Sequence, residues 1–172
     1  MTGTQQEISY IVREPRQKDV SLATELFSMK QAHCSRRFHR QMPGYRMSPL
    51  QGLPNLAAMF NVGGIWTKDE SSRLQLNSFK VLGGSFALYR YLQKQLGILG
   101  EDTPFAYLAS QEVKDKVGNL TFASATDGNH GRGIAWAAKR LGFKCVIYVH
   151  SETSVRRIDA IKSNGAKVVI ID

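Results

Sequence analysis

Lys80 is the residue of this 172-residue chain whose surroundings most clearly indicate chemistry. It lies in the segment Leu-Asn-Ser-Phe-Lys-Val-Leu-Gly-Gly (76–84), at the expected start of a helix. The positive end of a helix dipole disfavours the charged form of a nearby lysine, and a neutral amine condenses with aldehydes. The segment therefore predicts an imine-forming lysine. The alternative is an ordinary surface lysine on an amphipathic helix.

A second segment, Ala-Thr-Asp-Gly-Asn-His-Gly-Arg-Gly (125–133), joins an expected apolar strand to an expected long helix. Backbone N–H groups at a helix N-terminus bind carboxylates and phosphates. The pair Gly128-Asn129 is therefore a candidate anion cradle, although both residues are also common in ordinary turns. An amine next to an anion cradle is what the chemistry of pyridoxal phosphate requires.

The two segments together resemble the fold-type II pyridoxal-phosphate enzymes, the group of threonine dehydratase, serine racemase and tryptophan synthase β. The resemblance covers about residues 38–172 and is closest to the diaminopropionate ammonia-lyase family. Most of the group has serine where this chain has Asp127, and an acid there is typical of the ammonia-lyases. The matching stretches are Lys-Asp-Glu-Ser (68–71), Asn-Ser-Phe-Lys (77–80), Thr-Asp-Gly-Asn-His-Gly-Arg-Gly (126–133) and Ala-Trp-Ala-Ala (135–138).

The resemblance implies a role for each residue of the two segments. Lys80 would form the Schiff base with pyridoxal 5'-phosphate, and Asn129 would donate a hydrogen bond to the ring hydroxyl of the cofactor. The loop that includes Thr126, Gly128 and His130 would hold the substrate carboxylate through its backbone N–H groups. No metal site is implied.

Asp127 is the most informative single residue of the resemblance. In the resembling lyases this acid removes the α-proton of the D-isomer, whereas the lysine, here Lys80, serves the L-isomer from the opposite face. The alternative is that Asp127 only caps the following helix, which is the commonest role of aspartate at such a position.

The implied reaction is α,β-elimination of ammonia from 2,3-diaminopropionate, which gives pyruvate and ammonia. Two alternatives stay open on the sequence alone. One is a threonine or serine dehydratase of the same group, against which Asp127 argues. The other is a non-catalytic α/β fragment.

The composition limits the classes of partner. A formal net charge of +9 and the basic stretch at 36–40 raise the alternative of nucleic-acid binding. No recognition helix, zinc finger or RNA-binding sheet motif accompanies these charges, and the remaining basic residues, such as Arg156 and Arg157, are expected on solvated or oligomer-facing helix faces. The two cysteines lack metal-ligand spacing. Without a secretory signal or an 18-residue apolar run, we expect a cytoplasmic protein without membrane or nucleic-acid partners, and the resemblance implies a homodimer.

The periodicity of apolar residues places these motifs on an alternating series of helices and strands. This alternation predicts an α/β fold, a doubly wound parallel sheet with flanking helices. Helices are expected at about 22–41 after Ser21, 55–60, 78–96, 104–116, 128–141 and 154–164, and strands at 65–68, 120–125, 144–149 and 166–171, with a polar loop at 69–77.

The domain organisation is expected to be incomplete. Residues 1–20 are polar and read as a loosely attached arm, and residues 21–172 read as the N-terminal part of the enzyme, including most of its small domain. The last residues form an apolar strand whose sheet faces still need covering. In the resembling family a second half carries the glycine-rich phosphate loop and the partner of the pyridine nitrogen, so the chain is expected to be catalytically deficient alone.

Overall fold

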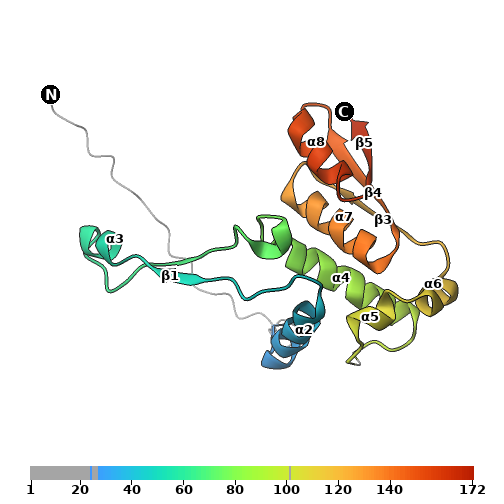
Figure 1. Cartoon of the computed structure of the whole chain (residues 1–172), viewed down its shortest axis with the longest axis horizontal. Helices are drawn as coiled ribbons and strands as arrows, with labels where there is room; N and C mark the ends of the chain where they lie inside the picture. Colours follow the sequence, from blue (N-terminus) through green and yellow to red (C-terminus); the bar gives the residue numbers. More distant parts are fainter. Residues whose placement is uncertain (1–23, 25–26, 101) are drawn as a thin grey trace, which may run out of the picture.

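The computed structural model describes residue 24 and residues 27–100 and 102–172. The expected polar arm at 1–20 and the predicted helix cap at Ser21 lie outside these residues. Within the described part, the chain forms an α/β body from which a narrow two-stranded extension projects (Figure 1).

A parallel sheet of three strands forms one side of the body, in the order β3-β4-β5. Side chains of β4 alternate, so that Cys145, Ile147 and Val149 are buried while the neighbouring positions face outward. The expected α/β class with a parallel sheet is confirmed. The strands are β3 (Thr121–Ala125), β4 (Lys144–His150) and β5 (Lys167–Ile171).

Helices α7 (Asn129–Leu141) and α8 (Val155–Lys162) connect these strands and cover the face that carries Ile147. A glycine is needed at position 131, because a Cβ there would lie 2.8 Å from Thr126 Cγ2 and 3.1 Å from Ile147 Cγ2. On the other face Tyr148 keeps 38% of its surface exposed. The helices of the described part therefore cover one face of the sheet.

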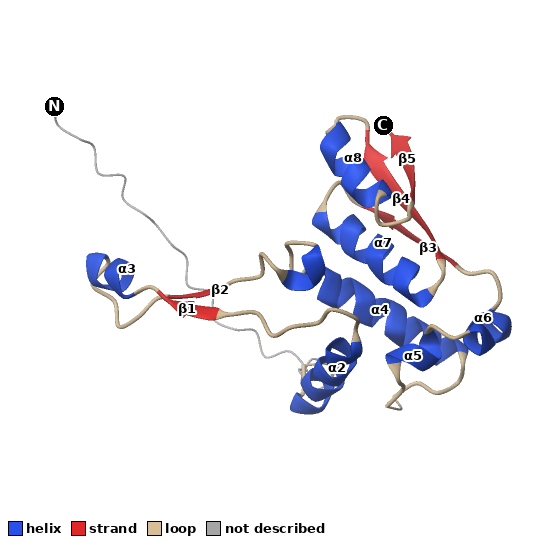
Figure 2. Ribbon diagram, in the orientation of Figure 1, coloured by secondary structure: helices blue, strands red, loops and turns tan. Residues whose placement is uncertain are grey.

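Helix α4 (Lys80–Gln95) packs on the outer side of α7, as Figure 2 shows. A Cβ on Gly133 of α7 would lie 2.8 Å from the Cα atom of Val81, so the two backbones approach each other directly. Buried side chains at helical spacing, including Val81, Leu88 and Leu92, form the face of α4 that meets the core. This packing fixes the start of α4 relative to α7.

Helix α2 (Met29–Gln41) lies against α4 and begins at the cap Ser28, whose Oγ accepts a hydrogen bond from the Gln31 N–H (3.4 Å). Phe38 is buried, and the His39 ring hydrogen-bonds the Leu82 carbonyl through Nε2 at 2.8 Å. Burial, partly opposed by this hydrogen bond, lowers the pKa of His39 from its usual value.

The single helix predicted at 104–116 is wrong. The chain instead forms α5 (Phe105–Leu108) and α6 (Gln111–Val117). Ser110 interrupts them because its hydroxyl accepts a hydrogen bond from the Val113 N–H (3.3 Å) and so begins a new helix.

The extension consists of strand β1 (Leu50–Gly52), paired antiparallel with β2 (Trp66–Lys68), and helix α3 (Pro54–Met59) at its tip (Figure 1). The strand expected at 65–68 and the helix expected at 55–60 are confirmed. The extension has almost no core of its own, since Met59 and Trp66 are 78% and 64% exposed.

The polar loop predicted at 69–77 is only partly correct. It contains a short 3-10 turn, η1 (Arg73–Gln75), and buries Arg73, Leu74 and Leu76. Three of its non-glycine residues, Leu74, Gln75 and Asn77, have positive φ angles of 47°, 61° and 55°. The segment resembles a solvated connection in the sequence because its buried residues have no regular period.

In the part of the chain that the structure describes, no helix combines the length and the apolar character that crossing a membrane requires.

Candidate functional site

A cavity of about 480 Å³ opens beyond the carboxyl ends of β3 and β4, next to the first residue of α4. Ligands of open parallel sheets bind at this edge. Three segments meet there: the start of α4, the turn between β3 and α7, and the start of α8. The lining residues are Lys80, Asp127, Gly128, Asn129, Arg132, Ser154, Arg156, Arg157 and Ala160.

Lys80 is the first residue of α4 and is exposed to the cavity. Its backbone N–H donates to Ser78 Oγ at 3.2 Å, and Ser78 is itself buried. The sequence-predicted position of the lysine at a helix entrance is therefore found. The following residue, Val81, is held in the contact between α4 and α7, so the helix that carries the lysine is fixed at its first turn.

The turn after β3 is only partly free to hold a ligand. The Thr126 N–H donates to the Tyr148 carbonyl at 2.9 Å, and the Gly128 N–H points to Thr126 Oγ1 at 3.5 Å. Gly128 and Asn129 line the cavity, as predicted, whereas Thr126 and His130 are not among the lining residues. The backbone N–H of Thr126 extends the sheet, which argues against its predicted part in holding a carboxylate.

Asp127 is not the cap of α7. The cap is Gly128, and no side chain caps the helix there. The Asp127 carboxylate instead accepts a hydrogen bond at Oδ2 from Arg157 Nη1, 3.1 Å away, and the pair is largely exposed at the mouth of the cavity. The cap interpretation of Asp127 is therefore wrong, and its carboxylate lies on the same cavity as Lys80.

Three arginines line the cavity, and two of them, Arg156 and Arg157, were missed as lining residues. Arg156 and Arg157 were expected on a solvated helix face, but the first turn of α8 brings both to the cavity, and Arg132 reaches it from α7. Arg132 Nη1 also lies 3.5 Å from Asn129 Oδ1. The signal available in the sequence was topological: α8 begins right after β4, and the carboxyl ends of neighbouring parallel strands share one edge.

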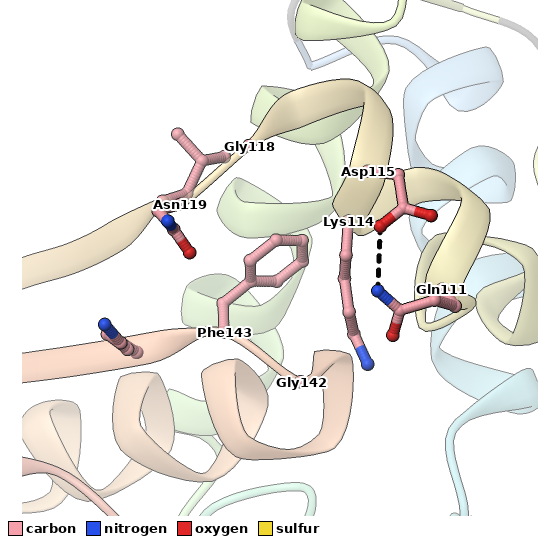
Figure 3. A pocket seen from close by; sticks show the side chains of 9 residues that line it. Gln111, Lys114, Asp115, Gly118, Asn119, Gly142 and Phe143 are labelled. Carbon is pink, nitrogen blue, oxygen red and sulfur yellow. Dashed lines mark hydrogen bonds between the residues drawn. The ribbon is translucent and has the colours of Figure 1, made fainter.

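A second cavity, of about 380 Å³, lies at the opposite edge of the sheet (Figure 3). It is lined by residues at the amino ends of β3 and β4, including Leu120 and Lys144, and by Lys114 of α6. At its wall Gln111 Nε2 donates a hydrogen bond to Asp115 Oδ1 at 2.8 Å. None of the sequence-predicted site residues reaches this cavity, and it lies at the sheet edge that ligands use less.

Comparison with known proteins decides the family. The family model described as pyridoxal-phosphate dependent enzyme matches residues 42–172. The chain belongs to this family. Pyridoxal phosphate is thus the cofactor of its family, as the resemblance implied.

One branch of the family is more similar to the chain than another. The chain is 44% identical to the diaminopropionate ammonia-lyase of Escherichia coli K12 over 148 residues, which is 86% of this chain and 36% of that protein. It is 26% identical over 110 residues to a probable D-serine dehydratase of Rhizobium leguminosarum, covering 62% of this chain and 25% of the dehydratase. The crystal structure of the E. coli ammonia-lyase in complex with D-serine matches with a TM-score of 0.77 at 44% identity, over 86% of this chain and 37% of that one. The chain thus spans about a third of the length of the ammonia-lyase and about a quarter of that of the dehydratase.

The cavity residues fit the chemical groups of pyridoxal phosphate. Lys80 offers an amine for its aldehyde, and Asn129 offers an amide that donates or accepts hydrogen bonds. The guanidinium groups of Arg132, Arg156 and Arg157 make this lining strongly cationic, with Asp127 the one acid among the lining residues, which suits an anionic ligand. Among the described residues, no group of three histidine, cysteine or acidic side chains is placed to hold a metal ion.

Proposed function

We propose that this chain is the lysine-bearing part of an enzyme that removes ammonia from 2,3-diaminopropionate by α,β-elimination and yields pyruvate and ammonia. The observation that carries the proposal is that Lys80 and Asp127 line one cavity. Two bases at different positions around one substrate, the Lys80 amine and the Asp127 carboxylate, suit an enzyme that accepts both isomers. The 44% identity to the E. coli ammonia-lyase favours this reaction over that of a dehydratase.

In this proposal the residues of the chain divide the work. Lys80 holds the cofactor aldehyde until the amino group of the substrate displaces it, and its freed Nζ atom then takes the α-proton of the L-isomer. Asp127 takes the α-proton of the D-isomer at its carboxylate. Asn129 holds the ring hydroxyl of the cofactor, and Gly128 donates to the substrate carboxylate. When bound, the cofactor supplies an electron-withdrawing ring that stabilises the negative charge left on the α-carbon.

Arg157 holds the Asp127 carboxylate at the mouth of the cavity. Its Nη1 donates a hydrogen bond to Asp127 Oδ2 at 3.1 Å. Because both side chains are more than half exposed, solvent weakens the pair, and a substrate can displace it.

The remaining features of the enzyme are proposed from the same relatives. Residues 21–172 would be the N-terminal part with most of the small domain, and a further part of the enzyme would supply the phosphate loop. We propose a homodimer in the cytoplasm, with a small amino acid as the substrate and without a nucleic-acid partner. Turnover by the 172 residues alone should then be far below that of a full-length relative.

The test is to trap the cofactor on its lysine. The chain is incubated with pyridoxal phosphate, reduced with sodium borohydride and digested, and the labelled peptide is identified by mass spectrometry. We expect one main adduct at Lys80, which Lys80→Ala abolishes. Lys94→Ala, which removes an exposed lysine from the last turn of the same helix, is the matched control and should leave the adduct unchanged. An adduct that persists in Lys80→Ala would contradict the assignment.

The reaction is tested separately by pyruvate release from D- and L-2,3-diaminopropionate. We expect little release by the 172-residue chain, and release with both isomers once the chain is joined to the downstream part of the E. coli relative. Turnover of serine or threonine in preference to 2,3-diaminopropionate by that joined protein would favour the dehydratase alternative.

A further inference from the structure

We propose that Arg73 is a positioning residue for Lys80. Its buried guanidinium anchors the left-handed turn from Arg73 to Asn77, and this turn sets where the chain enters α4 and presents the lysine. The proposal rests on the proposed function in one respect, that Lys80 is the lysine that binds the cofactor.

Arg73 is held by hydrogen bonds from all three of its guanidinium nitrogens. Nε donates to Glu70 Oε2 at 2.7 Å, Nη1 donates to the Arg46 carbonyl at 2.6 Å, and Nη2 donates to Ser48 Oγ at 2.7 Å and to Glu70 Oε1 at 3.0 Å. The guanidinium also lies over the Tyr45 ring, 5.2 Å from its centroid. The side chain is only 4% exposed. A buried guanidinium held by these four hydrogen bonds and by the ring contact has little freedom to reorient.

Glu70 is part of the same anchor. Its hydrogen bond with Arg73 lowers the pKa of the Glu70 carboxyl. Glu70 also accepts a hydrogen bond from the Ser48 hydroxyl, and Lys68 Nζ donates to the Ser48 carbonyl. Glu70 thus joins the end of β2 to an arginine that lies three residues further along the chain, toward Lys80.

The turn that follows Arg73 has a backbone conformation that only a surrounding structure maintains. Leu74, Gln75 and Asn77 have positive φ angles, which L-residues other than glycine seldom adopt. Such conformations persist where neighbouring contacts determine them, and they concentrate at functional sites. Here the anchor holds one end of the turn, and the buried side chains of Leu74 and Leu76 hold its middle.

The turn is connected to the lysine without a break. The Leu76 N–H donates to the Arg73 carbonyl at 2.8 Å, and the buried Ser78 then accepts from the Lys80 N–H at 3.2 Å. The contact between Val81 and Gly133 fixes the helix itself. The anchor therefore determines how the chain enters α4 just before Lys80, whereas the contact with α7 fixes the helix that follows.

A lysine in place of Arg73 tests geometry without removing charge. An ammonium group cannot reproduce the planar fork of donors that Glu70, Ser48 and the Arg46 carbonyl accept together. Arg46→Lys is the matched control, because the Arg46 side chain is exposed and its backbone carbonyl is unchanged. Val113→Ala, in α6, is a second control that lowers stability through a buried residue on another element.

Two measurements on the 172-residue chain report whether Lys80 is correctly positioned. The first is hydrogen exchange of the backbone amides at 76–82, which needs no cofactor. The second is the pyridoxal-phosphate concentration that gives half-maximal borohydride trapping at Lys80. If Arg73→Lys leaves the lysine correctly placed in about a tenth of the molecules, the trapping concentration rises about tenfold. We expect exchange at 76–82 to accelerate by at least about the same factor.

The outcomes are decisive in each case. Arg46→Lys should match the parent in both measurements, and Val113→Ala should lower the midpoint of unfolding without selective exchange at 76–82. Unchanged exchange in Arg73→Lys would overturn the proposal, as would the same selective changes in Val113→Ala.

If the parent shows no adduct, the proposed function fails, and the exchange measurement alone still decides the role of Arg73. If Arg73→Lys does not fold, Glu70→Gln, which keeps the shape of the anchor but removes its acid, should show the same selective acceleration to a smaller extent.

Discussion

The contact between α4 and α7 gives the sharpest prediction about stability, the substitution Gly133→Ala. The added methyl would lie 2.8 Å from Val81 Cα, 3.1 Å from Val81 N and 3.3 Å from Val81 Cβ. Two of these atoms are backbone, so no side-chain rotation relieves the clash. Overpacking of this kind costs about 1–3 kcal/mol, and we take about 3 because the backbone is involved. Alanine returns about 1 kcal/mol of helix propensity, which leaves a net loss of about 2 kcal/mol.

The measurement is the midpoint of thermal unfolding. For a chain of this length, a net loss of about 2 kcal/mol lowers the midpoint by about 4–8 °C. Gly83→Ala is the control, because Gly83 lies within α4 and an added Cβ there meets no atom within 4 Å. Gly83→Ala should raise stability by roughly 0.5–1 kcal/mol. If both alanine variants change stability in the same direction, the close backbone contact between α4 and α7 does not exist as described.

Three further predictions concern titration, thiol reactivity and stereochemistry. Burial lowers the pKa of His39, so below about pH 6.5 the unfolded chain binds more protons than the folded chain. Stability to urea should therefore fall as the pH drops from 7 to 5, and His39→Gln should flatten that dependence. The same slope in both proteins would contradict the prediction. Burial raises the pKa of the Cys145 thiol to about 11. At pH 8 a thiol reagent should therefore modify Cys34 rapidly and Cys145 only after denaturation. Equal rates of modification in the folded chain would refute the burial of Cys145. The third prediction concerns the chain joined to the downstream part of the E. coli relative. There, Asp127→Asn should lower turnover of D-2,3-diaminopropionate by a factor of about 10²–10⁴ and turnover of the L-isomer much less. Equal losses for both isomers would mean that Asp127 only organises the loop.

Local sequence signals were sufficient for the elements that carry the site. The apolar alternation of β4 and the helical spacing in α4 predicted a parallel α/β arrangement, and glycine-rich turns marked the ends of its helices. The cavity unites Lys80 and Asp127 because Lys80 begins α4 and Asp127 lies in the turn before α7, and the sequence predicted both helix starts to within two residues. The roles of these residues stay predictions until adduct and turnover measurements test them.

Contacts between distant residues could not be predicted from the same signals. Arg157 meets Asp127 across thirty positions of sequence, and Arg73 meets the Arg46 carbonyl across twenty-seven. Neither pair has a period or a motif, because each depends on how two elements dock. The positive φ at Leu74 was equally hidden, since leucine has no intrinsic preference for a left-handed turn and adopts it only under tertiary contacts.

The uneven burial of the two tryptophans turns the extension into a spectroscopic reporter. Trp66 lies on β2 and is 64% exposed, whereas Trp136 lies in α7, is 7% exposed and has the Arg140 guanidinium 5.4 Å from its ring centroid. These are the two tryptophans of the chain. Acrylamide should therefore quench Trp66 emission strongly and Trp136 emission weakly, and the variants Trp66→Phe and Trp136→Phe separate the two signals. A blue shift and protection of Trp66 alone would then signal that another molecule covers the extension, while a change at Trp136 would signal disturbance of the α/β body.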